Sequence, residues 1–206
     1  MQIDSRIVRY FAGLLAVAFI VGCSRFESDA DARVLSEIDE TTFGCISELT
    51  PVGRFYVGNL LGGLDETVAV AQSSTGGAFP AGSVVQLIPT EVMIKRETGF
   101  SDETDDWEFF ELDVSAQSTS IRTRGHANVT NRFGNNCLEC HEKAHDEWDM
   151  ICSTDHGCDP IPLSEDMIRA LQKTDPRCSP VELTEAETQA LELLPELLGA
   201  VSNSSQ

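Results

Sequence analysis

Short runs rich in Val, Ile and aromatic residues occupy the middle of the chain and predict a β-sheet. Turn-forming positions separate these runs, among them Pro89 and the polar stretch 99–106. The expected strands cover residues 83–88, 91–95 and 107–114, with a weaker fourth at 119–123. Alternation along the third run places Phe109 and Phe110 on opposite faces. One of them could cover a cofactor; the alternative is that both pack in the core or against a neighbouring strand.

Segments with helical spacing flank the predicted sheet. Helices are expected at 54–74, with irregular ends because of its glycines, and at 136–149, 164–175 and from 184 onward. The last of them opens with Thr184 and Glu187 in a capping-box pattern and is interrupted by Pro195, before a disordered tail at 202–206. Together the elements predict an α+β fold, an antiparallel β-sheet with flanking helices.

The first 22 residues have the pattern of an export signal. Arg6 and Arg9 precede an apolar run at 10–22 that is too short to span a bilayer comfortably. The run ends at Cys23 in a sequence that resembles a bacterial lipobox, in which the cysteine is acylated and becomes the first mature residue. Several acyl chains anchor a protein stably. Because Ser24 follows, the resemblance favours the outer membrane; a cleaved signal with an incidental cysteine and a retained membrane helix are the alternatives.

A single C-x-x-C-H motif, Cys137 to His141, follows the predicted sheet. In this pattern two cysteine sulfurs form thioethers to one haem and the histidine ligates the iron. A zinc ribbon would need a second ligand pair at compatible spacing, and the later pair Cys152 and Cys158 does not have it. A thiol redox pair gives no reason for a histidine directly after the second cysteine. We therefore predict one covalent haem c, held by Cys137, Cys140 and His141 on a helix in the carboxyl-terminal half.

Four cysteines remain after Cys23 is assigned to lipidation and Cys137 and Cys140 to haem attachment. In an oxidising compartment Cys45, Cys152, Cys158 and Cys178 predict two disulfides, in one of three connectivities. We favour Cys152 with Cys158, which closes a tight loop, and Cys45 with Cys178, which ties the amino-terminal segment to the far side of the haem region. A second metal site that also uses His156 is the alternative, although these separations fit no familiar zinc spacing.

The motifs divide the chain into four expected parts. These are a lipoprotein signal peptide at 1–22, a lipid-anchored acidic tether at 23–45, a single haem-binding domain at 46–182 and a carboxyl-terminal helix and tail at 183–206. The expected location is the bacterial cell envelope, lipid-anchored and facing the periplasm.

Acidity limits the partners. The formal charge is -20, and it becomes -21 when removal of residues 1–22 takes away Asp4, Arg6 and Arg9. Such a chain cannot neutralise phosphates, which excludes nucleic acid. Strong acidity is commonly a solvated surface, and it can also steer a basic redox partner protein.

The order of sheet and haem motif resembles the cytochrome P-460 and cytochrome c′-beta family, antiparallel β domains with the motif near the carboxyl end. The resemblance covers about 79–144 and rests on the Phe79-Pro80-x-Gly82 turn, the strand with Trp107, and a C-x-x-C-H followed by Ala144. It implies that His141 is the proximal ligand and that the other side of the iron is open or water-bound, with small gases or hydroxylamine as ligands there.

Family members of the P-460 type also bond a lysine to the haem edge. The equivalent position here is Leu87, and Lys95 is the only lysine in the sheet region, eight residues later. This departure argues against hydroxylamine oxidation.

The sixth iron ligand decides between two functions. Met150 is too close to His141 along the chain to cross the haem, and His145 lies on the same helical face as His141. Of the other histidines and methionines, His126 and Met93 in the sheet region are the best placed.

A strong sixth ligand predicts a membrane-anchored mono-haem c-type cytochrome, an electron carrier rather than an enzyme. The alternative is a five-coordinate haem protein that binds or processes nitric oxide or other small nitrogen oxides, which would make it an oxidoreductase. A structural lipoprotein with an accidental motif is the third possibility.

Overall fold

The structure is a computed structural model that describes residues 30–204. The predicted signal peptide and the lipidation site Cys23 lie outside the described residues. The chain divides into two compact units with the boundary between Glu37 and Ile38, and the described part of the first is helical at 30–36. Within residues 30–204, no helix has both the length and the apolar character needed to cross a membrane.

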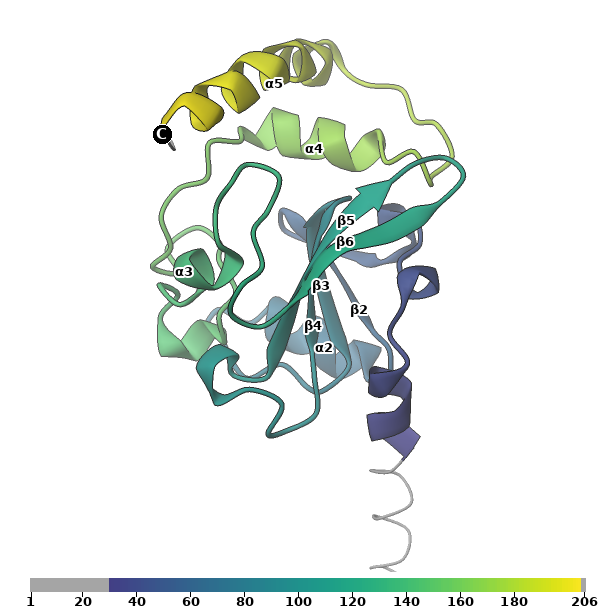
Figure 1. The fold of residues 1–206 in the computed structure, drawn as a ribbon, viewed down its shortest axis with the longest axis vertical. Coiled ribbons are helices and arrows are strands. Elements are labelled where there is room, and N and C mark those ends of the chain that lie inside the picture. Colours follow the sequence, from purple (N-terminus) through teal and green to yellow (C-terminus); the bar gives the residue numbers. More distant parts are fainter. Residues whose placement is uncertain (1–29, 205–206) are drawn as a thin grey trace, which may run out of the picture. The chain divides into compact units, whose positions relative to one another are not determined.

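The second unit is built on a six-stranded sheet in which each strand pairs antiparallel with the next along the chain (Figure 1). The strands are β1 Thr50–Val52, β2 Phe55–Asn59, β3 Ser83–Ile88, β4 Glu91–Lys95, β5 Trp107–Val114 and β6 Thr119–Gly125. The three strongest predictions match β3, β4 and β5, and β6 extends two residues beyond the predicted end. The antiparallel sheet of the predicted α+β class is confirmed.

The predicted helix at 54–74 is wrong in its first half. Phe55 and Val57 are both buried in β2, which pairs with β1 and β3 on its two sides. Their spacing of two residues is the period of a strand, and the sheet partners outweigh any local helical preference. Gly62, with φ of 85°, then turns the chain before the helix α2 Leu64–Ala71.

The predicted helix at 136–149 is also wrong in its second half, because the helix in the structure ends at His141. Helix α3 covers Cys137–His141, and a separate 3-10 turn follows at Asp146–Trp148. Between them His145 is extended and its backbone N–H donates to the carbonyl of His156, 2.8 Å away. This contact with the 152–158 loop replaces the hydrogen bond that a continuing helix would have made.

Two helices complete the unit, α4 Glu165–Lys173 and α5 Glu185–Ser204. The Thr184 hydroxyl accepts from the N–H of Glu187, whose carboxylate accepts from the N–H of Thr184, which is the predicted capping box. Helix α5 continues across Pro195 and through 202–204, where an interruption and a disordered tail were expected. Proline removes only one backbone donor, and the remaining hydrogen bonds can carry the helix past it.

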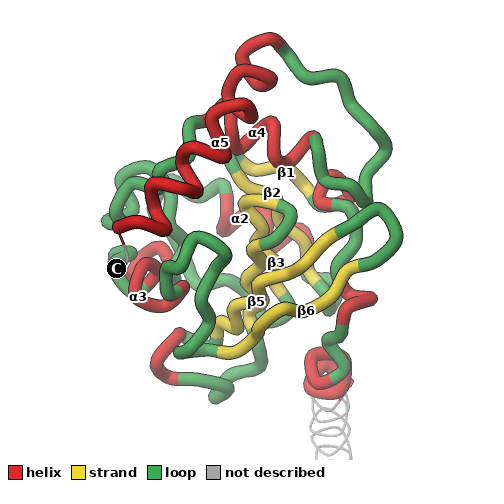
Figure 2. Tube along the Cα trace, turned by 45° about the horizontal axis from the view of Figure 1, so that its top comes forward, coloured by secondary structure: helices red, strands yellow, loops and turns green. Residues whose placement is uncertain are grey.

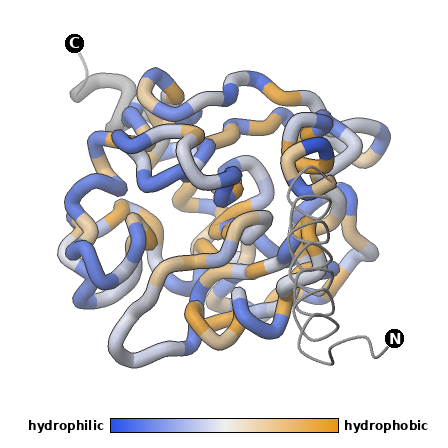
Figure 3. Tube along the Cα trace, turned by 90° about the horizontal axis from the view of Figure 1, so that it is seen from below, coloured by the Kyte–Doolittle hydropathy of each residue, from blue (hydrophilic) through white to orange (hydrophobic). Residues whose placement is uncertain are grey.

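Helices and loops cover the sheet in layers. Helix α2 packs on β2, α4 packs on β3, and α5 packs along α4, which lies beside it in both views (Figure 1 and Figure 2). Cross-strand register places four buried residues on one face of the sheet: Val57, Val85, Met93 and Phe109. Phe110 points to the opposite face and packs on Phe43, with ring centroids 5.1 Å apart. Figure 3 shows hydrophobic and hydrophilic stretches interspersed along the chain trace.

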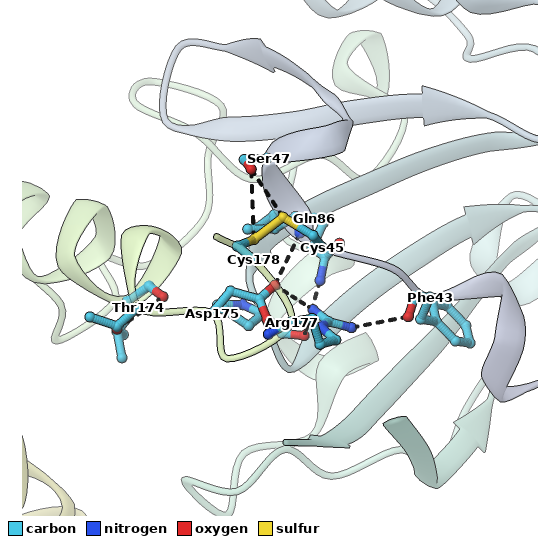
Figure 4. The surroundings of a disulfide bond; sticks show 11 residues. Phe43, Cys45, Ser47, Gln86, Thr174, Asp175, Arg177 and Cys178 are labelled. Atoms are coloured by element: carbon cyan, nitrogen blue, oxygen red, sulfur yellow. Dashed lines mark hydrogen bonds and ion pairs between the residues drawn. A yellow bond between two sulfur atoms is a disulfide. The ribbon is translucent and has the colours of Figure 1, made fainter. Parts of the chain in front are cut away.

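Two disulfides join distant and local segments, and they are the pairs that the sequence analysis favoured, Cys45–Cys178 and Cys152–Cys158. Around the first, the Asp175 carboxylate accepts from the backbone N–H of Ile46 at 3.0 Å. Figure 4 also shows Arg177 bound to Asp175 and to the Phe43 carbonyl. Residues 38–45, expected in the tether, are therefore part of the second unit, where Phe43 and Cys45 contact the segment around Asp175.

Candidate functional site

Helix α3 carries the C-x-x-C-H motif and begins at an asparagine cap. The side-chain oxygen of Asn136, Oδ1, accepts from the backbone N–H of Glu139 at 3.2 Å, and the side-chain Nδ2 of Asn136 donates to the backbone carbonyl of Ala127. The backbone N–H of Cys137 donates to the carbonyl of Val129. Leu138, 7% exposed, enters the same apolar core as Phe109. The first turn is thus anchored to the sheet face by its cap, its backbone and one apolar side chain.

The two motif cysteines are the free cysteines of the described chain, and both are partly buried. Burial, together with the carboxylates of Glu91 and Glu111, raises the pKa of Cys137 to about 12. Burial also raises the pKa of Cys140. Thiols that stay protonated at neutral pH are poor nucleophiles. The surroundings of the two cysteines therefore argue against a thiol redox pair, which needs a charged thiolate. They are compatible with a thioether, because a thioether carries no charge.

The His141 ring is held in one orientation. Its Nδ1–H donates to the carbonyl of Met150 at 2.7 Å, and the ring packs against Phe109 with centroids 5.3 Å apart. Because a carbonyl can only accept, Nδ1 carries the proton and Nε2 keeps its lone pair. Burial lowers the pKa of His141, and the hydrogen bond to Met150 opposes this in part. The motif histidine thus presents a neutral imidazole with Nε2 available to a metal.

The candidate sixth ligands lie in different surroundings. Met93 on β4 is 7% exposed and opposes Phe109 in register, in the same core that Leu138 enters. His126 is exposed, with its Nδ1 3.7 Å from a Glu103 carboxylate oxygen and its ring edge-on to Phe100. The structure therefore brings Met93 to the face that carries α3 and leaves His126 at the surface.

The histidine in the disulfide loop does not form a second metal site. His156 stacks on Trp148 at 3.8 Å and donates from Nδ1 to the carbonyl of Ile151, while Cys152 and Cys158 are oxidised. In the part of the chain from 30 to 204, no group of three or more His, Cys, Asp or Glu side chains could hold a metal ion.

Sequence reasoning missed a pair of carboxylates beside Cys137. Glu91 and Glu111 are directly opposite each other on β4 and β5. Asn131 donates to Glu91 and Arg132 donates to Glu111, but Oε2 of Glu111 is buried without a hydrogen-bond partner. Burial and the charge of Glu111 raise the pKa of Glu91 to about 7. The signal was present: each glutamate shares its strand face with a core residue, Met93 or Phe109.

Fold and site together define an α+β protein in which an antiparallel meander carries a helical C-x-x-C-H segment on one face. No protein-family model matches the chain, and comparison with curated proteins and with solved structures gives no match.

Proposed function

We propose that this protein is a mono-haem c-type cytochrome of the bacterial cell envelope that carries electrons. The observation that carries the proposal is the state of the C-x-x-C-H segment. Cys137 and Cys140 are unpaired while the other described cysteines form disulfides, and the Met150 carbonyl binds Nδ1 of His141 and leaves Nε2 free. An iron-ligating histidine commonly donates its other ring N–H to a carbonyl in this way.

Each residue of the segment then has one task. Cys137 and Cys140 would form the thioethers, and His141 would be the proximal ligand. When bound, the haem supplies a reversible one-electron iron couple. The chain contributes a fixed imidazole, a packed aromatic support from Phe109 and a partly buried attachment site.

The envelope location has two supports. The leader at 1–22 with Cys23 after it favours export and lipid anchoring, and disulfides persist in oxidising compartments. The outer membrane is favoured, with the protein facing the periplasm. The formal charge of -21 without residues 1–22 would steer a basic redox partner to it.

The second candidate is an open iron site that binds nitric oxide or a related small nitrogen oxide. It is favoured because two candidate sixth ligands are placed elsewhere: His126 is at the surface and His156 stacks on Trp148. Of these candidates and Met93, Met93 alone lies on the face that carries α3. If the Met93 sulfur does not reach the iron, the distal side stays open. The P-460 type of chemistry with a lysine–haem bond is disfavoured, because Lys95 is in a buried ion pair with Asp149.

Expression of the full chain with a cytochrome c maturation system tests the proposal. We expect a Soret band and haem that stays on the chain after denaturation. Cys137→Ala/Cys140→Ala should lose this covalent haem, whereas Cys152→Ser/Cys158→Ser should keep it. A wild-type protein without covalent haem would refute the proposal and support a structural lipoprotein.

The same preparation separates the two candidates. A low-spin ferrous spectrum with a sharp α band that carbon monoxide or nitric oxide leaves unchanged supports electron transfer. A high-spin spectrum that shifts when either gas is added supports the open site instead.

A further inference from the structure

A buried ion pair lies beside the loop that contacts His141. Nζ of Lys95 is 2.6 Å from Oδ1 of Asp149, and the two residues are 9% and 7% exposed. Oδ2 of Asp149 accepts from the backbone N–H of Phe79 at 2.7 Å. The Asp149 carbonyl accepts from the indole N–H of Trp107 at 2.9 Å. Both carboxylate oxygens and the carbonyl of Asp149 are thus bound by three different segments.

The backbone at this point has an unfavourable conformation. Asp149 and Met150 have φ of 47° and 63°, in the left-handed region that residues with a Cβ rarely adopt. Such a conformation persists only where surrounding contacts hold it. The contacts that do so here are those of Asp149, because Lys95, Trp107 and Phe79 bind it from the sheet and from the segment before β3.

The consequence of this backbone turn is the direction of one carbonyl. Met150 follows Asp149, and its oxygen is the acceptor for Nδ1 of His141. We infer that the Lys95–Asp149 ion pair, with Trp107, positions the Met150 carbonyl and thereby sets the tautomer and basicity of the proposed iron ligand. This inference rests on the proposed function. Lys95, Trp107 and Asp149 are positioning residues, since none of them is assigned to the iron.

The expected effect on the iron has a definite sign. A hydrogen bond from Nδ1–H to a carbonyl makes Nε2 a stronger donor, which stabilises the ferric state more than the ferrous state. A loosened Met150 carbonyl weakens that bond. The ferrous state should then be relatively favoured and the midpoint potential should rise.

Charge-neutral variants isolate this effect. Lys95→Met/Asp149→Asn removes the pair without changing the net charge, and Trp107→Phe removes one donor and keeps an aromatic ring. The matched control is Lys143→Met/Asp159→Asn, an exposed ion pair of 2.5 Å that starts two residues from His141. All are prepared as full chains loaded with haem. The measurements are the midpoint potential and the solvent exchange rate of the His141 ring N–H in the ferrous protein.

We expect Lys95→Met/Asp149→Asn to favour the ferrous state about tenfold, which is about 59 mV for a one-electron couple. Solvent exchange of the His141 ring N–H should become at least tenfold faster in the same double variant. Trp107→Phe should shift the midpoint potential and the exchange rate in the same directions. The Lys143→Met/Asp159→Asn control should shift neither. Trp107→Phe keeps the test valid if the double variant does not fold.

Two results would overturn the inference, and they are distinct. Loaded variants that are less stable but keep the wild-type potential and exchange rate would mean that the network is only structural. A wild-type chain that never acquires covalent haem would remove the proposed function itself, and with it the iron that the network is inferred to serve.

Discussion

At the scale of single residues, the candidate site combines groups whose protonation is displaced from ordinary values. The Cys137 thiol and the Glu91 carboxyl both have raised pKa values, about 12 and about 7, because both are buried next to Glu111. Both groups are therefore held towards their neutral forms. A cysteine held in its neutral form suits an uncharged thioether better than it suits thiolate chemistry.

Glu91 should make stability depend on pH. Its pKa is about 7 in the folded protein against 4.5 normally, so the folded state binds more protons between these values and the free energy of unfolding falls as pH rises from 4.5 to 7. Glu91→Gln should flatten this slope and gain at most about 3 kcal/mol at pH 8. Urea denaturation at several pH values measures both. An unchanged slope in the variant would show that Glu91 is not the group that titrates.

At the scale of elements, the capping residues explain where helices α4 and α5 begin. The Ser164 hydroxyl accepts from the N–H of Met167 at 3.2 Å at the start of α4. Helix α4 packs on α5 and on β3, and its Met167 and Ile168 are buried. Helix α5 is capped by Thr184, and Glu187, three residues later, completes a capping box. These local hydrogen bonds satisfy backbone donors that the helix itself cannot.

Removal of the α4 cap should cost stability without changing the fold. Ser164→Ala leaves the N–H of Met167 without its acceptor, and we expect a loss of about 1 kcal/mol. Ser164→Asp supplies another acceptor at the positive end of the helix and should keep wild-type stability. Thermal and chemical denaturation compare the three proteins. Equal losses in the alanine and aspartate variants would argue that the hydroxyl packs rather than caps.

At the scale of the whole second unit, the disulfides contribute unequally. Cys45–Cys178 joins residues 133 apart in sequence, and Cys152–Cys158 joins residues only 6 apart. A cross-link over a longer loop removes more conformational freedom from the unfolded chain. The long-range disulfide also lies beside the Asp175 and Arg177 contacts that fasten residues 43–46 to the fold.

Paired serine substitutions should reveal this difference. From loop closure alone we expect Cys45→Ser/Cys178→Ser to cost about 5 kcal/mol and Cys152→Ser/Cys158→Ser about 2 kcal/mol. Denaturant unfolding of each variant beside the wild type measures the losses. A larger loss from the short-range pair would mean that the 152–158 loop, which contacts His145, matters more than chain entropy.

Local pattern was sufficient wherever the determining contacts are close in sequence. The strands at 83–88, 91–95 and 107–114 were predicted to the residue, since each is a run rich in Val, Ile and aromatic residues that turn-forming positions separate from the next. The start of the helix near Ser164 and the capping box at Thr184 were located for the same reason. The spacing of Cys137, Cys140 and His141 predicts haem attachment without any knowledge of the fold.

Tertiary structure decided what depends on residues far apart in the chain. Residues 55–59 form a strand because they pair with β3. Helix α3 ends at His141 because the backbone N–H of His145 donates to the 152–158 loop. The orientation of the His141 ring depends on a carbonyl whose direction is set by Asp149, and Asp149 is held by Lys95, 54 residues away in sequence. By itself the sequence determined which side chains could attach a haem, because that is a property of neighbouring residues. Only the fold decided how the histidine is held, because its supports come from three separate segments.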